Sequence, residues 1–178
     1  MIKLKDILNE FKTLSVFDAD DTLIKSDAWI YVKHSNGKTS TLDPAEFAVY
    51  KEQPGDEFDF RDFSKKLQNP KIIKRNVNLL KKQLEKASKT SARRVTILTA
   101  RKIGLPIKQF FKTLGLDVYV VAVGSSDPKT KSDWIANQID KGYDTVYFSD
   151  DSMKNIKAVD ALKKQYPNVT IKTYHVKD

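Results

Sequence analysis

The chain has 178 residues, which is the length of one domain with room for a small insertion. It contains no cysteine and only two histidines, His34 and His175, so disulfides, thiolate zinc sites and iron–sulfur clusters are excluded, and a multi-histidine metal cage is disfavoured. No apolar run approaches the roughly 20 residues that span a bilayer. The N-terminus lacks the apolar core of a signal peptide, and we therefore expect a cytoplasmic protein without membrane contact.

The net charge of +9 is distributed unevenly along the chain. Residues 1–60 carry a net charge of −5, residues 61–113 carry +14, and residues 114–178 are neutral. A basic block of this kind attracts phosphates or nucleic acid at long range. It is also typical of a solvated helix face, and the charge pattern alone does not decide between these two interpretations.

Several elements are expected in the first part of the chain. Apolar spacing predicts a helix over residues 2–11, followed by a buried strand over residues 14–17. Asn36-Gly37 separates two β-prone runs and predicts a hairpin. Asp43-Pro44 predicts the start of a short helix, because Asp is a good cap and Pro suits the first turn. Residues 58–60 predict one more short extended segment.

Helices and strands alternate after the boundary at Asn69-Pro70. The helices are expected over residues 72–84, 105–114, 132–139 and 152–166, and the strands over residues 95–98, 118–123, 145–148 and 169–175. Continuous apolar strands that alternate with helices are typical of a parallel sheet covered on both faces. The sequence therefore predicts an α/β fold with a Rossmann-like core formed by residues 1–24 and 70–178. Residues 25–69 are expected to form a small inserted cap, a hairpin plus a short helix.

Polar side chains follow four of the predicted strands, at the edge where ligands bind in open parallel sheets. They are carboxylates, hydroxyls, cations and one amide: Asp18, Asp20 and Asp21; Thr99 and Arg101; Ser125, Ser126, Lys129 and Lys131; and Ser149, Asp150, Asp151 and Asn155. Several carboxylates can share one site only with a cation, because like charges repel. Hard oxygen ligands without Cys or His indicate Mg²⁺, and a lysine and a hydroxyl beside Mg²⁺ suit a phosphoryl group.

Four segments occur in the order of a known motif set. Residues 16–23 (VFDADDTL) join an apolar strand to Asp-x-Asp-x-Thr, and residues 96–101 (TILTAR) end a strand in Thr. Lys131 precedes a predicted helix, and residues 148–155 (FSDDSMKN) hold an acidic pair followed by Asn. Together they resemble the haloacid dehalogenase superfamily, most of whose members are Mg²⁺-dependent phosphohydrolases. The likeness is to small phage and bacterial types with a cap after the first motif. The Gly usual in that motif is Asp21 here.

The resemblance implies roles for these residues. Asp18 would attack phosphorus, form an aspartyl-phosphate and bind Mg²⁺. Asp20 would protonate the leaving oxygen and then activate water, while its backbone carbonyl would bind the metal. Thr99 and Lys131 would hold the phosphoryl oxygens. Because dehalogenase members lack the second Asp, the motif favours phosphoryl transfer over carbon–halogen cleavage.

The remaining site residues are expected close to the metal or the substrate. Asp150 and Asp151 would complete the metal shell, and which of them is the direct ligand stays open. Thr22, Arg101, Lys129 and Asn155 are expected to contact or orient the substrate. Lys129 is the alternative to Lys131, which is favoured because it directly precedes the predicted helix.

The expected function is hydrolysis of a phosphomonoester. The alternatives are a catalytically idle binding protein on the same fold and a phosphotransferase that uses the same intermediate.

Seven aromatic residues of the cap are interpreted as its own core, with base stacking as the alternative: Trp29, Tyr31, Phe47, Tyr50, Phe58, Phe60 and Phe63. The basic segment 61–113 leaves open a small metabolite, a nucleotide or a nucleic-acid end as the substrate. The oligomeric state is not predicted.

Overall fold

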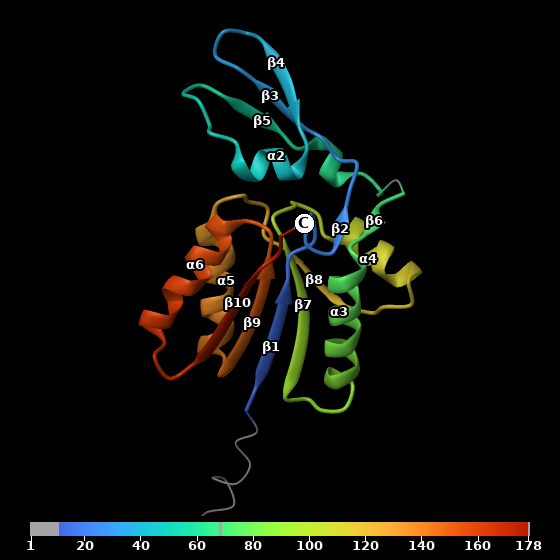
Figure 1. The fold of residues 1–178 in the computed structure, drawn as a ribbon, viewed down its shortest axis with the longest axis vertical. Coiled ribbons are helices and arrows are strands. Elements are labelled where there is room, and N and C mark those ends of the chain that lie inside the picture. The colour runs from blue at the N-terminus through green and yellow to red at the C-terminus, as the bar shows by residue number, and fades with distance from the viewer. Residues whose placement is uncertain (1–10, 68, 178) are drawn as a thin grey trace, which may run out of the picture.

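The computed structural model describes residues 11–67 and 69–177, and its core is a five-stranded parallel sheet. The strands lie in the order β10-β9-β1-β7-β8 (Figure 1). Their bounds are Thr13–Phe17 for β1, Arg93–Thr99 for β7, Tyr119–Ala122 for β8, Thr145–Asp150 for β9 and Thr170–His175 for β10. The predicted Rossmann-like α/β architecture is confirmed. The helix expected over residues 2–11 lies outside the described residues, apart from the exposed Phe11.

Helices cover both faces of the sheet (Figure 1). Strand β1 is buried along its whole length, and its side chains alternate between two cores. Leu14 and Val16 pack with α5 (Pro128–Asp140) and α6 (Met153–Gln165). Phe17 packs on the opposite side with α3 (Lys74–Ala87) and α4 (Leu105–Thr113). This double burial explains why the strand reads as a continuous apolar run.

The segment between β1 and α3 forms a second, antiparallel sheet with the order β4-β3-β5. Its strands are β3 (Ile30–Lys33), β4 (Thr39–Leu42) and β5 (Glu57–Asp59). The predicted hairpin at Asn36-Gly37 joins β3 to β4, with Gly37 at φ 81°. The predicted short helix is α2 (Pro44–Val49), which begins with a capping box between Asp43 and Glu46. We call residues 25–69 the cap.

The cap has its own core of aromatic and aliphatic side chains. Phe47 meets Phe58 and Phe60 edge to face, with both centroid distances at 5.4 Å. Phe63, in the 3₁₀ helix η1 (Arg61–Ser64), packs on Phe60 and belongs to the same cluster as the buried Ile30. These contacts confirm the predicted cap core for the Phe side chains, whereas Trp29, expected in the same core, is 45% exposed.

Two short strands connect the cap to the sheet. β2 (Ile24–Lys25) pairs antiparallel with β6 (Lys71–Ile72), so the chain enters and leaves the cap side by side. The sequence did not predict this pair. The cap lies over the carboxyl ends of the core strands (Figure 1). Within the described residues, no helix combines the length and the apolar character that a membrane span requires.

The largest error among the predicted boundaries of the core is at the start of α5. Helix α5 begins at Pro128, not at residue 132, because the Asp127 side chain caps it by accepting a hydrogen bond from the Lys129 backbone N–H at 2.9 Å. Lys131 therefore lies inside the first turns of the helix rather than before it.

Candidate active site

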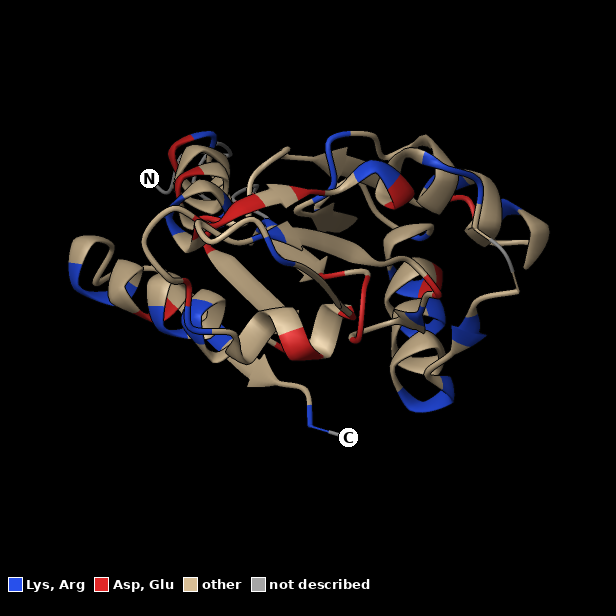
Figure 2. Ribbon diagram, turned by 90° about the horizontal axis from the view of Figure 1, so that it is seen from above, with Lys and Arg blue, Asp and Glu red and all other residues tan. Residues whose placement is uncertain are grey.

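The candidate site lies where β1, β7 and β9 end beneath the cap. Phe17 is in register with Ser149, and the Asp18 N–H donates to the Ser149 carbonyl at 2.9 Å. This pairing brings Asp18, the first residue after β1, next to Asp150, the last residue of β9. Acidic positions accordingly lie near the centre of the molecule when it is viewed from the cap side (Figure 2).

Lys131 joins the two carboxylates. Its ammonium lies 2.6 Å from Asp18 Oδ1 and 2.8 Å from Asp150 Oδ2. All three side chains are at least nine-tenths buried. Burial alone would lower the pKa of Lys131, but the charges of Asp18 and Asp150 outweigh it and raise that pKa above its usual range. Lys131 is therefore charged at neutral pH.

Asp150 is fully buried and accepts hydrogen bonds at both of its oxygens. The Asn155 amide donates to both oxygens at 3.0 Å, and the Ser152 backbone N–H donates to Oδ1 at 2.8 Å. Together with Lys131, these donors fix the orientation of the carboxylate. Asn155 therefore contacts the acidic cluster, while its expected contact with substrate stays a prediction.

Thr22 connects the first acidic loop to the second. Its hydroxyl donates to Asp151 Oδ1 at 3.3 Å and accepts from the Asp151 backbone N–H at 3.0 Å. Thr22 is completely buried, so in this structure it holds Asp151 in place and is not exposed to a ligand.

Three carboxylates converge in a way that suits a divalent cation. Asp18, Asp150 and Asp151 each offer one oxygen, and these oxygens lie within 4.8 Å of one another. Burial raises the pKa of Asp18 well above its ordinary value, and the neighbouring carboxylates add to this while Lys131 opposes it. Burial and the charge of Asp150 raise the pKa of Asp151 to about 7. Ionised together with Lys131, the cluster carries a charge of −2, which a cation such as Mg²⁺ would balance.

Asp20 does not belong to that cluster, because its carboxylate is engaged by Arg101. Arg101 Nε donates to Oδ2 at 2.8 Å, and Nη2 donates to Oδ1 at 2.6 Å. The Ser26 hydroxyl also donates to Oδ1, at 2.9 Å. Arg101 is itself only 4% exposed.

Thr99 and Lys129 differ sharply in their positions. Thr99 is buried at the end of β7, where its hydroxyl accepts from the Arg101 backbone N–H at 3.2 Å. Lys129 is exposed and pairs with Asp133 on the surface of α5. The structure thus brings Lys131, and not Lys129, to the acidic cluster. Lys131 was preferred because it was expected to precede the helix, and that reason is wrong, since Lys131 lies within α5.

The backbone of the first loop is left-handed at Asp21, with φ at 56°. Glycine adopts this conformation freely, and Asp is among the few other residues that tolerate it. Asp21 stands where the superfamily motif usually carries Gly, and the backbone at this position has a positive φ.

Sequence reasoning missed three contacts. These are the Ser26 hydroxyl, the Phe63 carbonyl that accepts from Arg101 at 3.1 Å, and His175, whose Nε2 lies 2.7 Å from the Asp151 carbonyl oxygen. His175 ends the last parallel strand in register with Asp150, so its place at a strand end was a usable signal. The other two residues lie in the cap, and no local pattern points to them.

Comparison with known proteins identifies no family. No protein-family model matches the chain, and no curated protein matches it. Membership in the haloacid dehalogenase superfamily therefore stays a prediction based on the motifs.

Proposed function

We propose that the protein is a Mg²⁺-dependent phosphatase of the haloacid dehalogenase type that hydrolyses a phosphomonoester through an aspartyl-phosphate on Asp18. One observation carries the proposal. A buried carboxylate at the end of β1 lies within reach of a buried lysine, and two further carboxylates lie where a divalent cation would be held. A nucleophile, a cation for the phosphoryl oxygens and a hard metal site are the parts that this reaction needs.

The reaction divides into two displacements. In the first, an Asp18 oxygen attacks phosphorus, the bond to the ester oxygen breaks, and Asp20 gives a proton to that leaving oxygen. In the second, Asp20 takes a proton from water as the water oxygen attacks phosphorus, and the bond to Asp18 breaks. Inorganic phosphate leaves and both carboxyl groups return to their starting forms.

The other site residues hold the reactants in position. Lys131 and Thr99 would contact the phosphoryl oxygens and stabilise the charge that develops on them. Asp18, Asp150 and Asp151 would hold Mg²⁺, with the Asp20 carbonyl as a further ligand. When bound, the metal neutralises phosphoryl charge and orients the group for in-line attack.

The direct test is Mg²⁺-dependent release of phosphate from p-nitrophenyl phosphate by the intact chain. Asp18→Asn should lower kcat by about a thousandfold or more while folding is retained, because Asn is isosteric and removes a buried charge. Asp133→Asn on the surface of α5 is the matched control and should keep wild-type activity. Equal activity of wild type and Asp18→Asn would rule out the proposed nucleophile.

The same assay separates the two alternatives. Transfer of phosphate to an added alcohol in preference to water would indicate a phosphotransferase. A wild-type protein that binds Mg²⁺ but hydrolyses no aryl or alkyl phosphate would indicate the idle binding protein.

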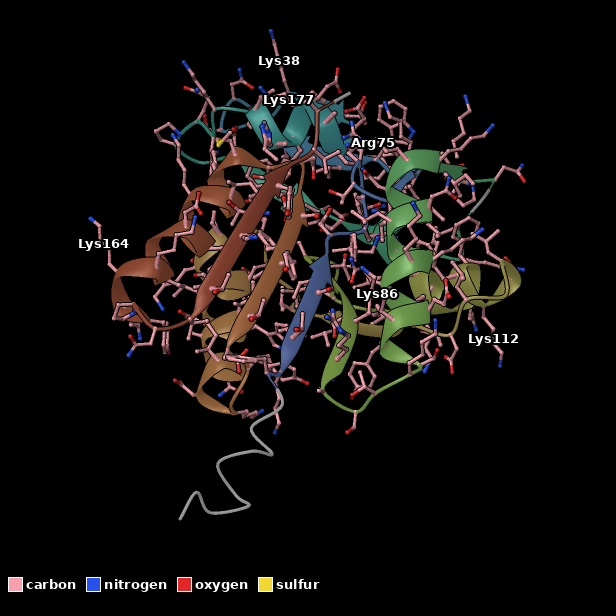
Figure 3. All side chains as sticks on the ribbon, turned by 60° about the horizontal axis from the view of Figure 1, so that its bottom comes forward. Lys38, Arg75, Lys86, Lys112, Lys164 and Lys177 are labelled. Atoms are coloured by element: carbon pink, nitrogen blue, oxygen red, sulfur yellow. The ribbon has the colours of Figure 1, made fainter. Side chains whose placement is uncertain are left out.

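A second observation favours an anionic polymer, such as a nucleic-acid end, as the substrate. Six exposed cations lie on α3 or just after it: Lys74, Arg75, Lys81, Lys82 and Lys86 on the helix, and Lys89 two residues beyond its end. Among the described residues, only Lys89 of these has an ion-pair partner, Glu85. Arg75 lies near the cap end of α3 and Lys86 further along it (Figure 3), and Asn76 in the first turn donates to the Thr22 carbonyl at 2.7 Å. The cationic face therefore begins beside the site.

The salt dependence of binding tests this substrate class. A 5′-phosphorylated single-stranded oligonucleotide should bind Asp18→Asn more weakly as salt rises, with a log–log slope of about −0.7 for each phosphate contact. Replacing Lys82, Lys86 and Lys89 with Gln should flatten the slope, whereas replacing Lys154, Lys157 and Lys163 on α6 should not. Binding without salt dependence would exclude the polymer and leave a small phosphorylated metabolite as the substrate.

A further inference from the structure

Arg101 was expected to bind substrate, but its guanidinium is already occupied within the protein. A guanidinium has five N–H donors, and four of them make contacts here. Two go to Asp20, one goes to the Ser26 hydroxyl at 3.2 Å, and one goes to the Phe63 carbonyl at 3.1 Å. Only one N–H donor is left and the side chain is almost fully buried, so Arg101 is poorly placed to bind a ligand.

The contacts of Arg101 join two parts of the molecule. Asp20 and Arg101 belong to loops of the core, whereas Ser26 and Phe63 belong to the cap. The guanidinium carbon also lies 4.7 Å from the centroid of the Phe63 ring, within the range of a cation–π contact. Phe63 packs within the cap core, so its position is tied to that of the cap.

We propose that Arg101 is a positioning residue that couples seating of the cap to the orientation of the Asp20 carboxylate. This inference rests on the proposed function only for what Asp20 does with a proton. While the cap lies against the core, the Phe63 carbonyl and ring hold the guanidinium of Arg101. The guanidinium in turn donates from Nε and Nη2 to the two oxygens of Asp20. When the cap lifts, the guanidinium loses its two contacts with Phe63, and Asp20 loses its fixed orientation.

The geometry of the fork makes the coupling specific. Nε and Nη2 donate to different oxygens of Asp20, and such bidentate pairing fixes the plane of a carboxylate as well as its position. Lysine offers only a point charge and cannot contact both oxygens and the Phe63 carbonyl in this way. Coupling free energies act in both directions, so Asp20 must also stabilise the seated cap.

Leaving-group dependence tests the consequence for Asp20. Phenolate needs a proton as it leaves, whereas 2,4-dinitrophenolate does not, so only hydrolysis of phenyl phosphate depends on a well-placed acid. Arg101→Lys should lose about tenfold or more in kcat/KM on phenyl phosphate beyond any loss on 2,4-dinitrophenyl phosphate. Arg61→Lys is the matched control, because Arg61 also lies over an aromatic ring, Tyr31 at 5.1 Å, but its side chain is exposed and pairs with Asp59 within the cap. Equal losses on the two substrates would overturn the proposal.

Hydrogen exchange tests the coupling without any activity. Asp20→Asn and Arg101→Lys should each speed amide exchange in residues 61–66 several-fold, while Asp133→Asn should leave it unchanged. Unchanged exchange in both variants would overturn the coupling. If the wild type hydrolyses no phosphate ester, the proposed function fails and the exchange result alone decides for or against the coupling.

Discussion

Asp18 and Asp20, two of the three carboxylates that follow β1, are held in place by different parts of the molecule. Asp18 is held by Lys131, which belongs to the core, and its neighbour Asp150 is held by the core residues Asn155 and Ser152. Asp20, two residues further on, is held by Arg101 and Ser26, and Arg101 is in turn tied to the cap. We call these the core half and the cap-linked half of the site.

The difference shows how one short loop can serve two needs. A nucleophile and a metal site must be oriented before any substrate arrives, because reorganisation during the reaction raises the barrier. An acid that acts on the leaving group is needed only once the substrate lies beneath the cap. In the proposed reaction, the core half would meet the first need with buried contacts inside the core, and the cap-linked half would meet the second with contacts that depend on the cap.

The largest effect is expected from breaking the core half at Lys131. Lys131→Met should lower kcat/KM by about a hundredfold or more, because it removes the ammonium that we propose stabilises phosphoryl charge. The loss should be the same on phenyl and on dinitrophenyl phosphate, unlike the unequal loss expected for Arg101→Lys. Steady-state kinetics on both esters measure this contrast.

Lys129→Met is the matched control, because Lys129 lies two residues away on the same helix and pairs only with exposed Asp133. It should change kcat/KM by less than about twofold, since exposed ion pairs contribute little. A large loss in Lys129→Met with wild-type activity in Lys131→Met would reverse the assignment of the phosphate-binding lysine.

A smaller effect is expected when pH and Mg²⁺ are varied. Both should change the stability of the fold through the carboxylates of the core half. Because the pKa of Asp151 is raised to about 7, the metal-free folded state binds more protons than the unfolded state between about pH 4 and 7. Its stability should therefore fall as pH rises through that window. Saturating Mg²⁺ should raise Tm by roughly 5–10 °C at pH 8 and by much less at pH 5.5.

Thermal unfolding with and without Mg²⁺ measures this shift, and Asp151→Asn should reduce its dependence on pH. Hydrogen exchange sharpens the comparison, because Mg²⁺ should protect residues 148–152 and leave residues 61–66 unchanged. A Mg²⁺ shift that is equal at both pH values would show that these carboxylates do not hold the metal.

The smallest effect is expected at Asp21, which lies between the two halves. Asp21→Gly should stabilise the fold by less than about 1 kcal/mol, because relief of the positive φ is offset by the greater freedom of glycine in the unfolded chain. Asp21→Val should destabilise it by about 1–2 kcal/mol. Urea unfolding of the two variants gives the comparison, and a more stable Val variant would contradict it.

The sequence predicted the core well because the central strands β1, β7 and β9 are largely buried on both faces and are therefore mostly apolar. The motif positions Asp18, Asp150 and Lys131 could be found because each lies at the end of a strand or near the start of a helix. The start of α5 was placed too late, although Asp127-Pro128 carried a capping signal, because the apolar spacing begins only at Trp134. The contact of Arg101 with Phe63 spans 38 residues and depends on how the cap sits, which no local pattern records.

The sheet order has a consequence for how the chain is made. β1 is the central strand, and its partners are β7 and β9, so Thr13 must pair with Arg93 and with Thr145. The cap sheet, in contrast, pairs residues 30–33 with residues 39–42 and 57–59. Contacts between residues close in sequence form fastest. During synthesis on a ribosome, the cap is therefore expected to fold before β9, the second strand that pairs with β1, has been made.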